Sequence, residues 1–354
     1  MFKTQVLLKE KKPVEAARII DQYLETTNEN APAEAYILLG AARHQAGDTE
    51  RTLRAFLQGH ERYPQNEHLC LNSAVVLYEQ EQYSKAGKLF EKAFILTAPP
   101  KPELLYQAGA AYYTGGNYKK AAQVMNKLFS MSVEHKKEWT RLAIHSFIEA
   151  GLLERAQTVL MTLLEKRPND AAYWELLAKV HMDREQYAQA AGALGISYRL
   201  KNASTAEMKR LANLYIYVDS PLKAANALQQ AYGTNRTPEQ ASQIASLYAS
   251  AGRIDKALET LNKTPNDSTK LLLEKAKILY MARRFDEASK VLSTSLKLSP
   301  GNAEAHFYNA LCAWEQKHWK TAKQEFNCIV KNKDFQNHAS NALAALEDLE
   351  NAKL

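Results

Sequence analysis

The sequence predicts an all-α protein, a solenoid of about ten helix-turn-helix units followed by a C-terminal capping helix. The first observation is a recurring pattern in which an aromatic residue is followed by alanine three residues later and by a large apolar residue four beyond that. It occurs in QEQYSKAGKLFEKAF from Gln80, GNYKKAAQVMNKLF from Gly116, REQYAQAAGAL from Arg184, RRFDEASKVL from Arg283 and KHWKTAKQEF from Lys317. The second observation is that glycine and proline fall where the helices of such units would end and begin.

A small residue in the second half of each unit defines the repeat length. It returns every 31 to 35 residues, at Ala17, Thr52, Ala86, Ala121, Ala156, Ala190, Ala224, Ala257, Ala288 and Ala322. A small side chain lets two antiparallel helices approach closely. We therefore expect the second helix of each unit, helix B, to pack against the first, helix A, through this position.

This period and pattern resemble the tetratricopeptide repeat family. The residues that carry the resemblance in two units are Trp174, Leu177, Ala178, Ala190 and Leu194, and Tyr36, Leu39, Gly40, Phe56 and Pro64. The resemblance implies a right-handed superhelix in which helix A of each unit lines a concave groove. It also implies that the groove binds a protein or a peptide.

Glycine and proline predict the limits of the helices. Glycines expected in the turn between helices A and B, where a left-handed C-terminal cap favours this residue, are Gly47, Gly151 and Gly252. Prolines expected to open helix B are Pro13 and Pro221, the second with Ser220 as its cap. Prolines expected to close a unit, because proline cannot continue a helix, are Pro64, Pro168 and Pro300.

The repeats predict one continuous solenoid over residues 1–334, with a partial first repeat at 1–32. The shortest interval falls around NKTPNDSTK, so residues 262–270 are the best candidate for a bend or a boundary. Residues 335–354 are expected to form the capping helix. Its acidic residues, Glu347, Asp348 and Glu350, favour solubility of this end of the array.

Composition and net charge limit the classes of protein to which the chain can belong. Apolar residues make up 46% and charged residues 24% of the 354 residues, which is ordinary globular composition. The formal net charge of +7 is spread along the chain, as on a solvated surface. No apolar run is long enough to span a membrane, so no direct membrane insertion is expected. The start MFKTQVLL enters a helical pattern without a favoured cap, which fits either a natural cytoplasmic start or the loss of a leader or anchor.

The motifs of catalysis and metal binding are not found in the sequence. It contains no HExxH, CxxC, GxxxxGK[ST] or GxGxxG, so we expect no enzyme activity, no cofactor and no metal. His60, His68 and Cys70 lie close together in HERYPQNEHLC without a recognised ligand spacing, and are interpreted as two surface histidines and a buried cysteine. His306 and Cys328 could approach across one hairpin, but two ligands do not make a site. The three cysteines are too scattered for a disulfide framework.

The family's groove positions identify candidate binding residues on helix A. The early part of the groove is apolar and aromatic, with Ile37, Leu71, Val75, Tyr78, Tyr106 and Tyr113. Exposed tyrosines would offer contact area at low entropic cost, although a neighbouring helix could cover them instead. The middle part is polar, with Arg141, His145, Lys179, Lys209 and Asn213.

Lys209 and Asn213 stand four residues apart and resemble half of the carboxylate clamp that some family members use on acidic tails. Gln243 stands where a second asparagine is expected, and Glu274 where an arginine is expected. Because a carboxylate repels a carboxylate, binding of an acidic chaperone tail is not favoured.

The leading hypothesis is a non-catalytic protein-binding scaffold. The later units, with Tyr173, Trp174, Ala178, LANLY and SPLKAA, also resemble tetratricopeptide proteins associated with TonB–ExbB–ExbD systems of Gram-negative bacteria. That resemblance implies a periplasmic accessory of energy transduction or transport, although the sequence also allows a cytoplasmic protein. An RNA-binding helical-repeat protein is a second hypothesis, which the irregular groove positions do not favour. An assembly subunit of a secretion or envelope-biogenesis machine is a third.

Overall fold

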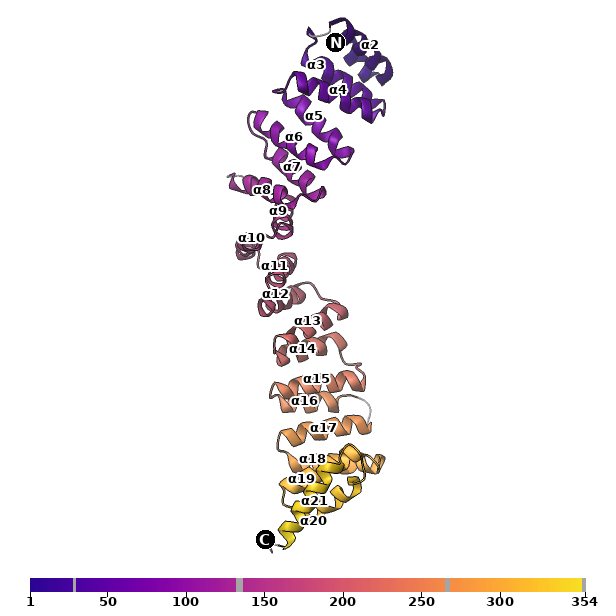
Figure 1. Ribbon diagram of the computed structural model, residues 1–354, viewed down its shortest axis with the longest axis vertical. Helices are drawn as coiled ribbons and strands as arrows, with labels where there is room; N and C mark the ends of the chain where they lie inside the picture. Colours follow the sequence, from indigo (N-terminus) through magenta and orange to yellow (C-terminus); the bar gives the residue numbers. More distant parts are fainter. Residues whose placement is uncertain (28–29, 132–135, 265–267, 352–354) are drawn as a thin grey trace. The chain divides into compact units, whose positions relative to one another are not determined.

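The structure, a computed structural model, describes residues 1–27, 30–131, 136–264 and 268–351. These residues form twenty-one α-helices and no strand, which confirms the all-α prediction (Figure 1). The chain divides into two compact units, Met1–Pro168 and Asn169–Leu354, which we describe separately.

The first unit contains ten helices within its described residues. They are α1 (Phe2–Lys9), α2 (Pro13–Thr27), α3 (Ala33–Gln45), α4 (Thr49–Arg62), α5 (Glu67–Glu79), α6 (Tyr83–Leu96), α7 (Pro102–Thr114), α8 (Tyr118–Ser130), α9 (Lys137–Glu149) and α10 (Leu153–Lys166).

The second unit contains eleven helices in the part of it that the structure describes. They are α11 (Ala171–Asp183), α12 (Tyr187–Leu200), α13 (Thr205–Tyr217), α14 (Pro221–Tyr232), α15 (Pro238–Ser250), α16 (Ile254–Asn262), α17 (Thr269–Met281), α18 (Phe285–Leu298), α19 (Ala303–Glu315), α20 (Trp319–Ile329) and α21 (Gln336–Asn351).

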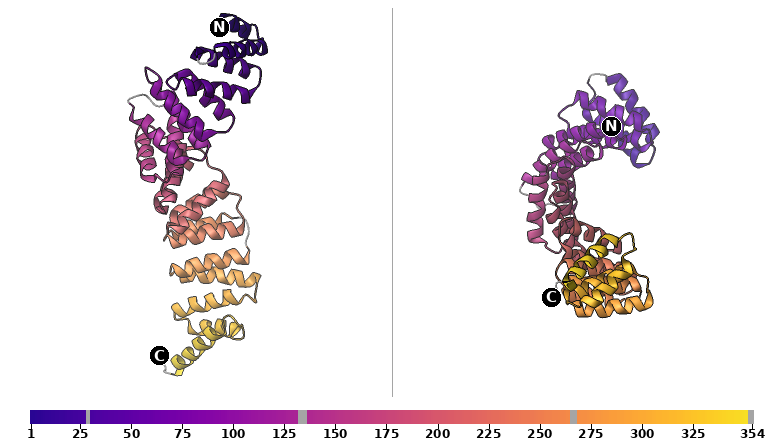
Figure 2. Two further views of the ribbon diagram at one scale, coloured as in Figure 1. Left: turned by 45° about the horizontal axis from the view of Figure 1, so that its top comes forward. Right: turned by 60° about the horizontal axis from the view of Figure 1, so that its bottom comes forward.

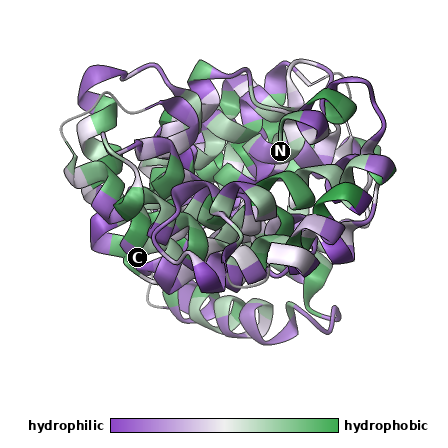
Figure 3. Cartoon of the chain, turned by 90° about the horizontal axis from the view of Figure 1, so that it is seen from above, coloured by the Kyte–Doolittle hydropathy of each residue, from purple (hydrophilic) through white to green (hydrophobic). Residues whose placement is uncertain are grey.

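The helices pack as hairpins in chain order. Each odd-numbered helix from α1 to α19 is a helix A and packs against the even-numbered helix B that follows it. Within each unit helix B also packs against the next helix A, and most neighbouring A helices touch, as α7 does α9 and α15 does α17. The hairpins of each unit therefore stack one on the next (Figure 2). Individual helices carry both hydrophobic and hydrophilic residues, the pattern of helices that are half covered by neighbours (Figure 3).

The recurring small residue is the fourth residue of every helix B. From α4 to α20 this position is fully buried, with no exposed surface at Thr52, Ala86, Ala121, Ala156, Ala190, Ala224, Ala257, Ala288 and Ala322. The prediction was wrong by one residue in the first repeat. There α2 begins at Pro13, so the fourth residue is the fully buried Ala16, whereas Ala17 is only half-buried.

Each turn between helices A and B contains one residue in the left-handed conformation, two positions before helix B begins. It is glycine in four turns, Gly47, Gly116, Gly151 and Gly252, and another residue in six, Lys11, Glu81, Glu185, Asp219, Arg283 and Lys317. The turn glycines that the sequence predicted are thus confirmed, as are Pro13 and Pro221 as first residues of helix B. The predicted cap was wrong in one respect: Ser220 occupies the N-cap position of α14, but its side chain makes no capping hydrogen bond.

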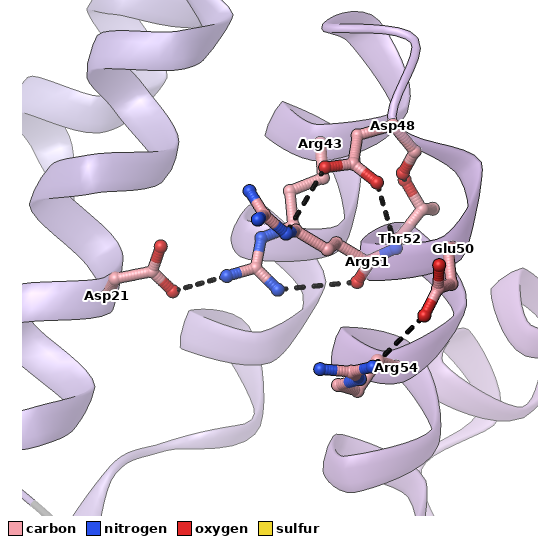
Figure 4. Close-up of polar contacts among 7 residues, drawn as sticks. All are labelled: Asp21, Arg43, Asp48, Glu50, Arg51, Thr52 and Arg54. Carbon is pink, nitrogen blue, oxygen red and sulfur yellow. Dashed lines mark hydrogen bonds and ion pairs between the residues drawn. The ribbon is translucent and has the colours of Figure 1, made fainter.

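Polar contacts tie the first hairpins together (Figure 4). Asp48 caps α4, its carboxylate accepting a hydrogen bond of 3.0 Å from the Arg51 backbone N–H. Arg43 of α3 reaches back to α2, where its Nη2 lies 2.7 Å from Oδ1 of Asp21, and its Nη1 donates to the Arg51 carbonyl. One side chain therefore links three successive helices.

The helix α21 follows the tenth hairpin as the predicted final helix and packs on α20. Its buried residues Ala339 and Leu346 join Phe326 in the last core cluster, and Glu350 pairs with Lys323 at 2.7 Å. The predicted bend near 262–270 includes residues 265–267, which lie outside the described residues. Among the helices that the structure describes, none is both long and apolar enough to cross a membrane.

Candidate ligand-binding surface of the A helices

The eleven predicted groove residues all lie on A helices, at the fifth, ninth or twelfth residue of each. In the first unit they are Ile37 on α3, Leu71, Val75 and Tyr78 on α5, Tyr106 and Tyr113 on α7, and Arg141 and His145 on α9. In the second unit they are Lys179 on α11 and Lys209 and Asn213 on α13. Whether they bind a partner stays a prediction, and their surroundings differ.

The apolar residues of α3 and α5 are exposed to different extents. Val75 is 39% and Tyr78 38% exposed. Ile37 is half-buried and packs against the cluster of Phe56, Leu69 and Val76. The exposed apolar surface of α5 therefore comes mainly from its ninth and twelfth residues.

The tyrosines at the twelfth residue of helix A also have a structural role. Tyr78 contacts the first residue of its own helix B, Tyr83, edge to face at 5.1 Å between ring centroids, and Tyr113 contacts Tyr118 likewise at 5.3 Å. The same contact recurs between Trp314 and Trp319. Edge-to-face aromatic pairs contribute about 0.5–1.5 kcal/mol beyond their buried area. Both interpretations of these tyrosines thus hold in part: they pack within their hairpins, and Tyr78 remains exposed.

Four of the predicted residues come together in one hollow between α7 and α9, which we call the α7–α9 pocket. Its volume is about 440 Å³, and its lining comprises Tyr106, Tyr113, Lys137, Glu138, Arg141, Leu142 and His145. The Tyr106 ring stacks on the ring of Trp139, with 6.1 Å between the ring centroids. Sequence reasoning missed Lys137, Glu138 and Leu142. Glu138 is the second residue of α9 and stands one helical turn before Arg141 on the same helix.

The α7–α9 pocket combines aromatic faces with more positive than negative charge. Lys137 and Arg141 are exposed, and neither forms an ion pair with the residues that the structure describes. Glu138 is the one carboxylate among the lining residues that the structure describes. Arginine and tyrosine together are typical of sites that bind peptides through a carboxylate and an apolar neighbour.

The polar residues of the second unit are not brought together. Lys209 is half-buried, and its Nζ lies 4.8 Å from the ring centroid of Tyr232 at the end of its own helix B. Lys179 and Asn213 are exposed, and neither lines the α7–α9 pocket or the hollows of the second unit described below. Glu274 pairs with Lys277 on the same helix at 3.2 Å. Gln243 and Glu274 therefore do not complete a carboxylate clamp with Lys209 and Asn213.

The helix B side of the second unit has a hollow that the sequence did not predict. It lies between α12 and α14 over α13, has a volume of about 440 Å³ and is lined in part by Tyr198, Arg199, Tyr215 and Lys223, with no carboxylate among its described residues. Burial raises the pKa of the Tyr215 hydroxyl, while the charge of Arg199 opposes this effect. Tyr215 therefore stays a neutral hydroxyl in the lining of this hollow.

The interpretation of His60 and His68 as surface histidines was wrong for His60, which is half-buried with its Nδ1 enclosed, whereas His68 is exposed. Cys70 is fully buried, its thiol donates to the Leu89 carbonyl at 3.2 Å, and burial raises its pKa to about 11. His306 uses both ring nitrogens, on Glu325 at 2.5 Å and on the Pro300 carbonyl at 2.8 Å. Among the described residues no group of three or more His, Cys, Asp or Glu side chains is arranged to hold a metal.

Family models describing the tetratricopeptide repeat match residues 71–129 and 134–306. Similar solved structures include a tetratricopeptide repeat protein from Parabacteroides merdae, with 16% identity, a TM-score of 0.37 and coverage of 69% of this chain and 95% of that one. YrrB, described as having an unusual peptide-binding site, shows 17% identity and a TM-score of 0.40 over 57% of this chain and 98% of its own. Yeast Tom70 shows 14% identity and a TM-score of 0.35, with coverage of 99% of this chain and 95% of its own.

No curated protein sequence matches the chain significantly. The two matched stretches together span more than half of the 354 residues and fall on the hairpins described above. The chain therefore belongs to the tetratricopeptide repeat family, whose fold serves protein-binding scaffolds.

Proposed function

We propose that the protein is a scaffold that holds a partner protein through the α7–α9 pocket. The observation that carries the proposal is the convergence of Tyr106, Tyr113, Arg141 and His145 on one hollow of about 440 Å³. A volume of this order accommodates one or two side chains of an extended segment. The partner segment presents an acidic residue to Lys137 and Arg141 and an apolar residue to the tyrosines.

The finer part of the proposal concerns where the scaffold acts. We place it in the periplasm of a Gram-negative bacterium, as an accessory of an envelope complex such as TonB–ExbB–ExbD. The support is sequence resemblance in the second unit, at Tyr173, Trp174, LANLY and SPLKAA. An envelope-assembly subunit would use the same pocket, so the identity of the partner decides between the two.

A pull-down from a native envelope extract tests both parts. The pocket variant Tyr106→Ala/Arg141→Glu is compared with Tyr217→Ala/Arg155→Glu, whose residues are exposed and lie outside the pocket. We expect the wild type and the control to capture the same proteins and the pocket variant to lose them. Recovery of TonB-system components would support the finer proposal.

Equal capture by the pocket variant, shown by circular dichroism to be folded, would contradict the role of the pocket. Capture of cytosolic proteins alone, lost in the variant, would sustain the scaffold and contradict the periplasmic placement. Capture of RNA in their place would contradict the scaffold itself.

A further inference from the structure

A second, smaller hollow lies on the helix B side of the second unit, between α14 and α16. It has a volume of about 100 Å³ and is lined by Gln229, Arg236, Tyr248, Lys256, Glu259, Thr260 and Lys263. Arg236 comes from the loop that joins α14 to α15, and the other residues come from α14, α15 and α16 or, for Lys263, from the end of α16. None of these residues belongs to the A-helix groove that the sequence predicted.

Arg236 is the unusual member of this set. Its Nε and Nη1 atoms are buried and have no hydrogen-bond partner among the residues that the structure describes. A buried donor without an acceptor destabilises the folded state, and more so when the group is charged. Native proteins rarely tolerate such a group unless something else supplies the acceptor. Because the guanidinium also lines the hollow, an acceptor bound there would lie beside these unsatisfied donors.

The charges around Arg236 indicate the sign of that acceptor. Lys256 and Lys263 bring two more cations, and the one carboxylate in the described lining, Glu259, pairs with Lys263 at 2.6 Å. The charge of Lys256 also acts on Glu259, so the lining residues that the structure describes carry three positive charges against one negative charge. Two uncompensated positive charges match a group that carries two negative charges.

The hydroxyls of the hollow are already engaged. The Tyr248 hydroxyl lies 2.8 Å from Oδ1 of Asn226 and 2.6 Å from Oε1 of Gln229, so it can donate to either amide oxygen. Thr260 donates to the Lys256 carbonyl at 2.8 Å. The donors left for a ligand are the Arg236 guanidinium, the Lys256 ammonium and the Gln229 amide, and the two cations are groups that bind oxyanions.

We propose that this hollow is a phosphoryl-binding site, with Arg236 and Lys256 as its main ligands. A phosphate monoester carries about −1.5 to −2 charges at pH 7 and presents three acceptor oxygens, which suits two uncompensated cations better than a single carboxylate does. Inorganic phosphate and the phosphate of a small monoester share this chemistry, and both fit a hollow of about 100 Å³ at their phosphoryl end.

The site is tested by titrating the full chain with inorganic phosphate, glycerol phosphate and acetate at constant ionic strength, measured by isothermal titration calorimetry. We expect saturable phosphate binding with one site per chain and no comparable acetate binding. Arg236→Gln should weaken phosphate binding at least tenfold, and Lys256→Gln should weaken it severalfold. The matched controls Arg210→Gln and Lys290→Gln replace exposed residues outside the hollow and should bind as the wild type does.

Binding of glycerol phosphate as well would identify a monoester as the source of the group, and binding of phosphate alone would identify the free ion. The Lys256→Gln result stands on its own if Arg236→Gln does not fold. Absence of saturable phosphate binding would overturn the proposal. Equal binding of acetate, or wild-type phosphate affinity in both hollow variants, would overturn it as well.

Discussion

At the scale of single residues, the turn between helices A and B combines a fixed backbone requirement with a variable sequence. Every such turn has one left-handed residue, yet only four of the ten are glycine. The sequence could identify the glycine turns because glycine adopts positive φ at no steric cost. It could not identify Lys11, Glu81 or Lys317, since nothing in these side chains favours that conformation. There the packing of the two helices imposes it.

Two glycine substitutions should therefore have opposite effects. Gly116 has φ of 74°, and a Cβ there would meet nothing within 4 Å, so Gly116→Ala should destabilise the fold by about 1 kcal/mol through backbone strain alone. Gly192 lies inside α12 with equally open space, and Gly192→Ala should stabilise it by about 0.5–1 kcal/mol. Urea unfolding followed by circular dichroism measures both. Shifts of the same sign would contradict this account of the turn.

His60 should make stability depend on pH. Burial, together with the Lys92 ammonium 3.2 Å from its Nε2, lowers the pKa of His60 below its usual 6.5. The unfolded chain then binds more protons than the folded one below pH 6.5, so the stability from neutral His60 is lost as pH falls through the lowered pKa. We expect the urea midpoint to fall between about pH 7 and 5.5, and to fall less in His60→Gln.

The control for this titration is His68→Gln, because the His68 side chain is largely exposed. It should keep the pH dependence of the wild type. If His60→Gln also keeps that dependence, His60 is not the titrating group.

At the scale of helices, the period of the small residue predicted the hairpins well. Nine of the ten predicted positions are the fourth residue of a helix B and are fully buried. The tenth was placed at Ala17 because EAARII offers two adjacent alanines of the same size. Only the helix start at Pro13 shows that Ala16 faces the core. Periodicity gives the spacing of repeats, whereas the phase within one helix depends on where that helix begins.

Enlarging the fourth residue of helix B should be costly, and enlarging the second residue should not. Ala190→Leu introduces a large side chain where no surface is exposed, and should destabilise the protein by about 1–3 kcal/mol. Ala188→Leu places the same side chain on the exposed face of the same helix and should change stability by less than about 0.5 kcal/mol. Chemical denaturation of the two variants makes the comparison, and similar losses in both would show that the position is not specially packed.

At the scale of the whole molecule, four of the predicted groove residues line one hollow of the first unit, whereas those of the second unit do not come together. Tyr106, Tyr113, Arg141 and His145 meet because the fifth, ninth and twelfth residues of neighbouring A helices share a face, which the family's positions could predict. Lys209 is held instead by Tyr232, a contact between residues in different helices that no sequence spacing reveals.

The helix B side could not be predicted in the same way. Arg236 lies in a loop, outside the repeat positions, and the hollow beside it forms only once α14, α15 and α16 are packed. The repeat period identifies residues that recur from unit to unit. It does not identify a site whose residues occur only once in the chain.

The measurement that tests the central claim most directly is site-specific photocross-linking in living cells, with benzoylphenylalanine in place of Tyr113 in the α7–α9 pocket. The matched control carries the probe at Tyr217, which is 70% exposed and lies outside that pocket. We predict a discrete protein adduct at Tyr113 that disappears when Arg141→Glu is added, and no such adduct at Tyr217. The same adduct at both positions, or none at Tyr113, would contradict the claim that this pocket holds a partner protein.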